Sequence, residues 1–273
     1  MSARAEAARA ARSLKAARVP DAAFEAELLV RTAAGLTRPE YFANPDLDGE
    51  ARERLEDLIR RRSMREPFAY ITGRREFFGR EFAVTPDVLI PRPETETLVE
   101  VGLAEVKRNP NAVVVDVGAG SGAIAISVAV EAPQATVVGV DVSATALGVA
   151  RGNAARLAPS VRFVRGNLAD ALGHADVVLA NLPYIPSRTV LTLEPEVRDW
   201  EPRRALDGGP DGLDLVRALI DDCARRLRPR LLALELAVGQ DVAVSRYGES
   251  LGASVSVVRD LAGIERVVCF RWA

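Results

Sequence analysis

The sequence has few of the residues that build disulfides, zinc sites and catalytic triads. Its 273 residues include two cysteines and one histidine. Cys223 and Cys269 fall in a predicted helix and a predicted strand without metal-ligand spacing, so we expect both to be buried as small apolar side chains. His174 lies just before a predicted strand and is expected in a loop. The sequence therefore predicts no metal site, and it leaves a Ser-His-Asp or Cys-His mechanism without a base.

The sequence also has no long hydrophobic run and no strong bias of charge. The formal net charge is -2, and 48% of the residues are apolar. Charged residues interrupt the N-terminal segment every few positions, and no stretch reaches the length of a membrane span. We expect a cytoplasmic monomer that binds neither membranes nor nucleic acid directly.

Residues 1–64 predict a small helical domain, because they are rich in Ala, Leu, Glu and Arg and are broken at proline, glycine and asparagine positions. Over residues 1–80 the basic side chains outnumber the acidic ones by 16 to 13, whereas the remainder of the chain has a net charge of -5. The charged surface of this domain is either the solvated face of a helical cap or a docking surface for a macromolecular substrate.

Three helices of this domain have sequence signals of their own. The helix that begins near residue 20 is expected to carry one apolar side made of Phe24, Leu28 and Leu29. Residues 37–40 read Thr-Arg-Pro-Glu, which is the spacing of a capping box. The helix over residues 48–62 places opposite charges four residues apart, which predicts the pairs Glu56–Arg60 and Asp57–Arg61.

Residues 65–87 predict a linker with a β-hairpin, because aromatic and β-favouring residues flank Gly79-Arg80 on both sides. Residues 88–96 then read Val-Leu-Ile-Pro-Arg-Pro-Glu-Thr-Glu. Two prolines hold this stretch extended, and the Thr-Glu pair after them opens a helix. Because this stretch is rich in proline and charge and lies beside a loop, we predict that it forms one wall of a binding site. Arg92 is expected either to pair with Glu94 or to line the substrate entrance.

A strand, a glycine-rich loop and a helix follow one another between residues 112 and 127. The glycines of the loop, residues 118–122, let the backbone turn sharply and approach a ligand closely. Asp116 precedes the loop, and Asp141 ends the next predicted strand, where a carboxylate is placed to accept both ribose hydroxyls. This pattern indicates a small nucleotide-like ligand; the alternative is a tight turn with an acidic helix cap.

The remaining chain alternates strands and helices and closes with two strands joined by a short connection. This order predicts an α/β domain over residues 88–273, with a mostly parallel sheet and one antiparallel strand. The third strand ends at Asn167-Leu168. Because ligands of doubly wound sheets lie beyond the carboxyl ends of the strands, these two residues are expected beside an adenine ring.

The fourth strand ends abruptly in Asn181-Leu182-Pro183-Tyr184. Four apolar residues followed by Asn, Pro and an aromatic residue predict a strand that delivers a rigid polar loop to one edge of the sheet. Asn181 offers a side-chain carbonyl, Leu182 its backbone carbonyl and Tyr184 a flat face. The loop suits a substrate with a planar amine group.

These motifs together resemble those of a known enzyme class. The Asp116-x-Gly-x-Gly-x-Gly motif, Asp141 and the Asn181-x-Pro-Tyr loop are similar to those of class I S-adenosylmethionine-dependent methyltransferases, which have a Rossmann-like fold. Residues 66–73, 77–79, 89–96 and 201–213 look like the motifs of the release-factor glutamine methyltransferases, the PrmC/HemK family. The resemblance covers nearly the whole chain, and the Ile-Pro-Arg-Pro-Glu-Thr-Glu stretch is highly specific.

Leu182 departs from the family's usual Asn-Pro-Pro-Tyr loop. Asn-Leu-Pro-Tyr is familiar from ribosomal-RNA adenine dimethyltransferases, so methylation of an adenine amine in nucleic acid is the alternative function. The change is tolerable, because the contact needed from this position is a backbone carbonyl and Pro183 still favours an extended residue before it. An adenine methyltransferase of that type is expected to carry its extra domain after the catalytic one and a strongly basic face. This chain has neither feature.

The resemblance implies methylation of the glutamine side-chain amide in the Gly-Gly-Gln motif of peptide-chain release factors. S-adenosylmethionine is the implied donor, S-adenosylhomocysteine is the product and no metal takes part. The implied catalytic residues are Asn181, Leu182, Pro183 and Tyr184. The same four residues, together with Arg92 and Pro93, are expected to bind the substrate. The implied contacts of the donor are Asp116, Gly118, Ala119, Gly120, Ser121, Gly122, Asp141, Val142, Asn167, Leu168 and Asn181. The helical domain is expected to dock the release factor.

Overall fold

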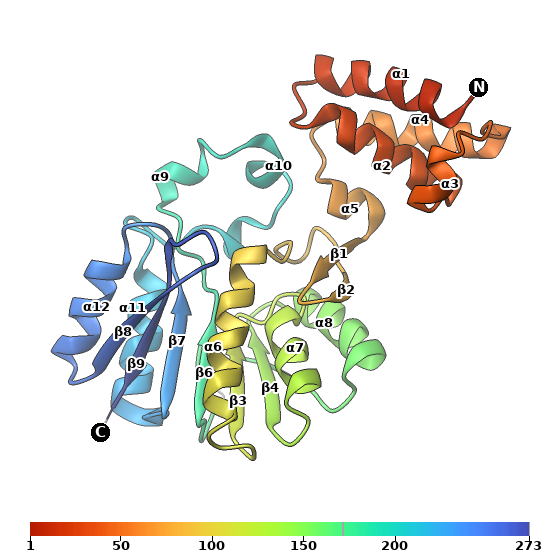
Figure 1. The fold of residues 1–273 in the computed structure, drawn as a ribbon. Helices are drawn as coiled ribbons and strands as arrows, with labels where there is room; N and C mark the ends of the chain where they lie inside the picture. The colour runs from red at the N-terminus through yellow and green to blue at the C-terminus, as the bar shows by residue number, and fades with distance from the viewer. Residues whose placement is uncertain (171, 273) are drawn as a thin grey trace. The chain divides into compact units, whose positions relative to one another are not determined.

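A computed structural model of the chain describes residues 1–170 and 172–272 (Figure 1). The chain divides into two compact units. The first comprises Met1–Gly73 and Glu194–Trp200, and the second comprises Arg74–Leu193 and Glu201–Ala273. Among the helices described, none has the length and apolar character needed to cross a membrane.

The first unit is built from helices around one apolar core. Its helices are α1 (Ala3–Ala16), α2 (Ala22–Ala34), α3 (Arg38–Phe42), α4 (Gly49–Ser63), α5 (Phe68–Thr72) and α10 (Pro195–Arg198). The predicted capping box of α3 is confirmed, because the Thr37 hydroxyl accepts from the Glu40 N–H and the Glu40 carboxylate accepts from the Thr37 N–H. The prediction for Phe24 is wrong: its side chain is exposed, because the buried face of α2 runs through Ala26, Leu29, Val30 and Ala33.

The predicted ion pairs of α4 are also wrong, because its charged side chains take other partners. Glu56 binds Arg9 of α1, and Arg61 binds Glu66, which follows the end of α4. Arg60 pairs with Asp57, three residues before it and not four.

A buried arginine ties α4 to α2 and to α10 within this unit. The Arg62 side chain is 4% exposed, and its guanidinium donates to Glu25 at 2.5 Å and to Glu196 at 2.9 Å. Arg65 binds the same Glu196 carboxylate at 2.6 Å. Burial alone would raise the pKa of Glu196, but the hydrogen bonds from Arg65 and Arg62 outweigh burial and lower it. The segment Glu194–Trp200 is therefore held by charge to the helices of the first unit.

The second unit begins with the predicted β-hairpin, β1 (Arg74–Phe77) and β2 (Arg80–Ala83), which pair antiparallel around Gly79. Phe77 and Phe82 are buried on one face of the hairpin. The hairpin is joined to the next segment by the Phe78 N–H, which donates to Glu96 at 2.8 Å.

A seven-stranded sheet forms the centre of the second unit and confirms the predicted α/β class. Its strands are β3 (Val113–Val117), β4 (Thr136–Asp141), β5 (Arg162–Arg165), β6 (Val177–Ala180), β7 (Leu231–Glu235), β8 (Ser254–Arg259) and β9 (Glu265–Arg271). The order across the sheet is β5-β4-β3-β6-β7-β9-β8, and β9 runs antiparallel to both of its neighbours. The sheet is thus parallel except for one strand, as the sequence predicts.

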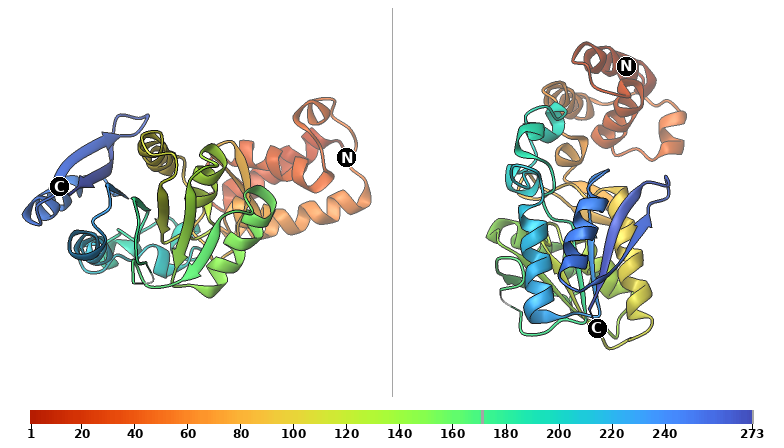
Figure 2. Two further views of the ribbon diagram at one scale, coloured as in Figure 1. Left: turned by 90° about the horizontal axis from the view of Figure 1, so that it is seen from below. Right: turned by 90° about the vertical axis from the view of Figure 1, so that its left-hand side faces the viewer.

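Helices cover both faces of this sheet (Figure 2). The helices and short helical turns are η1 (Pro93–Thr95), α6 (Glu96–Val106), α7 (Ala123–Glu131), α8 (Ala144–Leu157), α9 (Ser187–Val190), η2 (Arg203–Ala205), α11 (Asp214–Asp222), a π-helical turn η3 (Cys223–Leu227) and α12 (Asp241–Ser250). Leu98 of α6 and Ile126 of α7 share one core with Val114, whereas Leu219 of α11 shares the other core with Val115. This alternation along β3 follows from the two-residue period of a strand and shows that both faces are buried.

Candidate active site

The glycine loop connects β3 to α7 at the carboxyl edge of the sheet. The N–H groups of Gly118 and Ala119 donate to the Val140 carbonyl at 2.8 and 3.0 Å, which ties the loop to the end of β4. Gly118, Gly120 and Gly122 all have positive φ, a conformation that favours glycine. A Cβ added at Gly120 would find no other atom closer than 3.9 Å, so a ligand has room to approach the backbone there.

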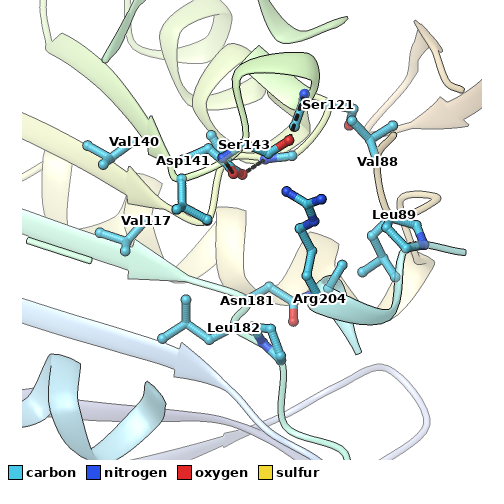
Figure 3. Close-up of a pocket in the computed structure, with 18 of the residues that line it drawn as sticks. Val88, Leu89, Val117, Ser121, Val140, Asp141, Ser143, Asn181, Leu182 and Arg204 are labelled. Carbon is cyan, nitrogen blue, oxygen red and sulfur yellow. Dashed lines mark hydrogen bonds between the residues drawn. The ribbon is translucent and has the colours of Figure 1, made fainter. Parts of the chain in front are cut away.

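Asp141 ends β4 with both carboxylate oxygens oriented by backbone donors. Oδ2 accepts from the Gly120 N–H at 2.9 Å, and Oδ1 accepts from the Ser143 N–H at 2.8 Å. Each oxygen keeps a further lone pair for a ligand hydroxyl. Asp141 therefore shapes the glycine loop and faces the pocket at the same time (Figure 3).

Asp116 lies beneath the glycine loop and not in the pocket. Its carboxylate is fully buried, and Oδ2 accepts from the Ala125 N–H at 3.0 Å at the start of α7. No donor within residues 1–170 and 172–272 reaches Oδ1. Burial raises the pKa of Asp116 to about 7, and the nearby Asp141 charge adds to the shift. Asp116 thus holds the helix start, and any contact with a ligand would be indirect.

A pocket at this edge of the sheet brings most of the predicted site residues together. Those that line it are Arg92, Gly118, Ala119, Gly120, Ser121, Asp141, Val142, Asn167, Leu168, Asn181, Leu182 and Pro183. Four predicted residues are not among its lining: Pro93, Asp116, Gly122 and Tyr184. In Figure 3, Asp141 and Ser143 lie on one side of the pocket, Asn181 and Leu182 lie on the other, and the Arg204 side chain extends between them.

Several lining residues were not identified from the sequence. Among them, Val88, Leu89, Pro91 and Thr95 lie in the stretch predicted to form a wall of a site, although none of them is itself a predicted site residue. The others are Asp87, Val117, Ala123, Ile124, Val140, Ser143, Ala146, Gly166, Pro202, Arg204, Ala205 and Leu215. Val117 and Val140 precede the glycine loop and Asp141 directly, so their place at strand ends was a usable signal. Arg204 had no such signal, because its η2 turn reaches the pocket only through the fold.

Asn181 follows β6, and its amide is oriented by a single hydrogen bond. Nδ2 donates to the Thr95 hydroxyl at 3.1 Å. The Thr95 contact therefore does not use Oδ1, which can accept a hydrogen bond from another group. The Leu182 side chain is buried, and its Cδ2 lies 3.2 Å from where a Cβ of Gly118 would be. Leu182 therefore joins the Asn-Leu-Pro-Tyr loop to the glycine loop by packing as well as by its place in the chain.

The segment Gly208–Gly212 supports the backbone of the Asn-Leu-Pro-Tyr loop. The Ile185 N–H donates to the Leu206 carbonyl at 3.0 Å, and the Gly208 N–H donates back to the Ile185 carbonyl at 2.9 Å. The Tyr184 carbonyl accepts from Gln240 Nε2 at 2.9 Å. Together these hydrogen bonds hold the backbone of the loop against residues 206–208 and Gln240.

Replacing Gly212 with alanine is expected to disturb this support. The added Cβ would lie 2.2 Å from the Tyr184 carbonyl oxygen, and Gly212 has φ +82. We expect the variant to lose about 1–3 kcal/mol of stability, as overpacked sites do, and to slow the reaction of the site about 100-fold through misplacement of the loop.

Urea unfolding measures the loss of stability, and the initial rate of the protein's reaction measures the loss of activity. Gly148→Ala is the matched control, because Gly148 lies in α8 with nothing within 4 Å of an added Cβ. A Gly212→Ala variant with unchanged activity would contradict the supporting role of this segment.

Arg92 pairs with Glu201 and not with Glu94. The Glu201 side chain is 1% exposed and binds the Arg92 guanidinium, while its Oε2 accepts from the Ile90 N–H at 3.1 Å. Glu201 thus fixes the extended Ile-Pro-Arg stretch against η2. Arg92 also lines the pocket, so the expectation that it faces the site entrance is compatible with its ion pair.

Tyr184 points its hydroxyl at Glu235, the last residue of β7. The hydroxyl donates to Oε1 at 3.4 Å. Burial raises the pKa of Tyr184 above its usual range, and the Glu235 charge adds to the shift. Burial also raises the pKa of Glu235 to about 7, against hydrogen bonds from Thr95 and Tyr184 that lower it.

The two cysteines and the histidine are not among the residues that line the pocket. Cys223 and Cys269 are buried, as predicted, and burial raises their pKa values to about 12 and about 11. His174 is exposed in a loop, with Nε2 3.5 Å from Asp176. In the described part of the chain, no group of three or more His, Cys, Asp or Glu residues could hold a metal ion.

Comparison with known proteins decides the family. Residues 7–73 match the family model described as the PrmC N-terminal domain, and residues 95–192 match the methyltransferase small domain. A release factor glutamine methyltransferase of Caulobacter vibrioides is 41% identical over 263 residues, covering 93% of this chain and 91% of that protein. That of Gloeobacter violaceus is 45% identical over 277 residues, covering 96% and 95%. The chain belongs to the release factor glutamine methyltransferase family.

Family membership confirms the resemblance that the motifs carry. A methyltransferase from Pyrococcus furiosus has a similar fold, with a TM-score of 0.52 over 71% of this chain and 89% of that protein, at 19% sequence identity. The fold is therefore a methyltransferase fold, and the pocket described above lies at the carboxyl edge of its sheet.

Proposed function

We propose that the protein transfers a methyl group from S-adenosylmethionine to the side-chain amide nitrogen of a glutamine, the one in the Gly-Gly-Gln motif of peptide-chain release factors. The observation that carries this proposal is the orientation of Asn181, whose Nδ2 is bound to Thr95 so that Oδ1 remains to accept a substrate N–H beside the donor pocket. The match to these relatives covers nearly their whole length. Their names support glutamine and not adenine as the acceptor.

The pocket suits the donor in three respects. Asp141 offers oriented carboxylate oxygens for ribose hydroxyls, and the glycine loop leaves its backbone open at Gly120. Asn167 and Leu168 lie in the same lining, where an adenine ring can stack and form hydrogen bonds. When bound there, S-adenosylmethionine supplies a methyl group on a positively charged sulfur.

The loop residues compensate for the low nucleophilicity of an amide nitrogen. The nitrogen lone pair of glutamine is delocalised into its carbonyl, so the site must orient and polarise the amide. We assign the acceptance of its two hydrogens to Asn181 Oδ1 and to the Leu182 backbone carbonyl, which together aim the lone pair at the methyl group. Such positioning lowers a barrier by about 7 kcal/mol or more in ideal intramolecular cases. No strong base is required, because the nitrogen becomes acidic only as the new bond forms.

The other loop residues have supporting roles in this proposal. Pro183 stiffens the loop, and Tyr184, which does not line the pocket, supports the loop through the bond of its hydroxyl to Glu235. Arg92 and Pro93 belong to the substrate side. The helical domain over residues 1–64 docks the release factor, and residues 65–87 link it to the methyltransferase domain over residues 88–273.

Incubation of the protein with a methyl-labelled donor tests the proposal. We expect label in a release factor, located by peptide mass spectrometry on the glutamine of its Gly-Gly-Gln motif. A release factor with alanine in place of that glutamine is the matched control and should stay unlabelled. Ribosomal RNA is offered in parallel. Label confined to RNA would establish the adenine alternative and overturn the proposal.

A further inference from the structure

Arg204 is a cationic side chain of the pocket that has no partner in the described part of the chain. Its side chain extends between the wall that carries Asp141 and the wall that carries Asn181 (Figure 3). Within residues 1–170 and 172–272, no hydrogen bond or ion pair engages its guanidinium. We propose that Arg204 binds the carboxylate at the amino-acid end of S-adenosylmethionine. This inference rests on the proposed function for the identity of the methyl donor.

The other charged side chains of the lining are already engaged. Arg92 is the second arginine there, and its guanidinium binds Glu201, whose side chain is 1% exposed. Asp141 accepts from backbone N–H groups, and Asp87 is hydrogen-bonded to the Thr85 hydroxyl at 3.3 Å. Neither aspartate forms an ion pair with Arg204. Among the residues that line the pocket, the positive charge of Arg204 is therefore the one available to an anionic ligand group.

The backbone of the glycine loop has little to offer an anion. The N–H groups of Gly118, Ala119, Gly120 and Gly122 all donate to acceptors within the protein, the last of them to the Ala119 carbonyl at 2.7 Å. Loops that bind phosphate instead keep such N–H groups free and point them at the anion. A carboxylate that enters this pocket therefore needs a side-chain partner.

The chemistry of the donor brings its carboxylate toward Arg204. The sulfur of S-adenosylmethionine carries three substituents, which are the ribose methylene, the methyl group and the amino-acid chain. If the ribose lies at Asp141 and the methyl group faces Asn181, the amino-acid chain begins between these two walls, where Arg204 extends. The adenosine part carries no anionic group, so the carboxylate is the group that pairs with a guanidinium. The planar fork of arginine matches a carboxylate with two parallel hydrogen bonds.

The backbone of Arg204 is anchored although its side chain is exposed. Arg204 is the middle residue of η2, in which the Ala205 N–H donates to the Pro202 carbonyl at 2.8 Å. The next residue, Leu206, is buried, and its carbonyl accepts from Ile185, which follows the Asn-Leu-Pro-Tyr loop. The turn therefore holds the arginine in a fixed place relative to that loop. Since the side chain itself has no partner, its removal should not affect folding.

Two ligands that differ by one carboxylate test the proposal. S-adenosylmethionine and its decarboxylated analogue are titrated calorimetrically into the wild-type protein and into Arg204→Met, without any methyl acceptor. We expect Arg204→Met to bind S-adenosylmethionine about 10- to 100-fold more weakly, the scale of a hydrogen-bonded charge pair. Its affinity for the decarboxylated analogue should not fall. Arg204→Lys, which keeps the charge but not the planar fork, should recover part of the lost affinity.

Arg188→Met is the matched control, because Arg188 is also exposed but does not line the pocket. It should bind both ligands as the wild-type protein does, and urea should unfold both methionine variants at the wild-type concentration. Equal loss of affinity for the two ligands in Arg204→Met would indicate a structural effect and overturn the proposal. Unchanged affinity for S-adenosylmethionine in this variant would overturn it as well.

The binding measurement separates this inference from the proposed function. If the wild-type protein binds S-adenosylmethionine and Arg204→Met binds it equally well, the role of Arg204 is refuted and the donor stands. If the wild-type protein binds neither ligand, the donor is refuted and the role of Arg204 with it. A loss that depends on the carboxylate upholds the inference even if the methyl label of the transfer assay goes to ribosomal RNA.

Discussion

Asn181→Ala is expected to lower the rate of methyl transfer about 100- to 1,000-fold, the range measured when one preorganised hydrogen-bonding group is removed from an active site. The variant loses the Oδ1 acceptor for the substrate amide and leaves the Thr95 hydroxyl without its donor. The donor pocket is little changed, because Asp141 and the glycine loop are held by their own backbone hydrogen bonds. Single-turnover transfer measures the rate, and calorimetry measures the affinity for S-adenosylmethionine.

Asn111→Ala is the control for this substitution, because Asn111 is exposed in the turn before β3. It should match the wild-type protein in both measurements. If Asn181→Ala weakened donor binding as much as it slowed transfer, Asn181 would be a donor-binding residue and its proposed role toward the substrate would be wrong.

Asp141→Ala is expected to produce the opposite pattern, with a large loss of donor affinity. Hydrogen bonds to a charged group contribute about 1.5–3 kcal/mol each, so two lost ribose contacts correspond to roughly 100-fold weaker binding or more. The substitution also removes the acceptor of the Gly120 and Ser143 N–H groups, which loosens the glycine loop. Saturating donor should therefore restore only part of the transfer rate.

Glu249→Ala controls for the removal of a carboxylate as such, since Glu249 is exposed on α12. Its donor affinity should equal that of the wild-type protein. Wild-type donor affinity in Asp141→Ala itself would show that the pocket does not bind the ribose through this residue.

The donor side of the site was predictable because its parts are local. The glycine loop follows β3 directly, and Asp141 ends β4. Each motif spans a few residues, and the glycines themselves indicate the positive φ angles that the loop adopts. The alternation of strands and helices likewise predicts a sheet with one antiparallel member. Asp116 shows the limit of this reasoning, because the motif indicates a carboxylate at the site and the fold buries it under the helix start.

The substrate side could not be predicted in the same way, since it is assembled by long-range contacts. Thr95 and Asn181 are 86 residues apart, and Tyr184 and Glu235 are 51 apart. No periodicity relates such positions. A long-range contact also changes one predicted pair of α4, because Glu56 binds Arg9 of α1 in place of Arg60.

The segment Glu194–Trp200 has a consequence for any attempt to shorten the protein. The polypeptide leaves the methyltransferase unit soon after the Asn-Leu-Pro-Tyr loop, contributes Glu196 to the helical unit and returns at Glu201, which binds Arg92. A chain starting at Arg74 would keep Glu196 but lose Arg62 and Arg65, its two cationic partners. The helical domain is thus not a detachable module, and an exchange of N-terminal domains between relatives must carry this internal segment with it.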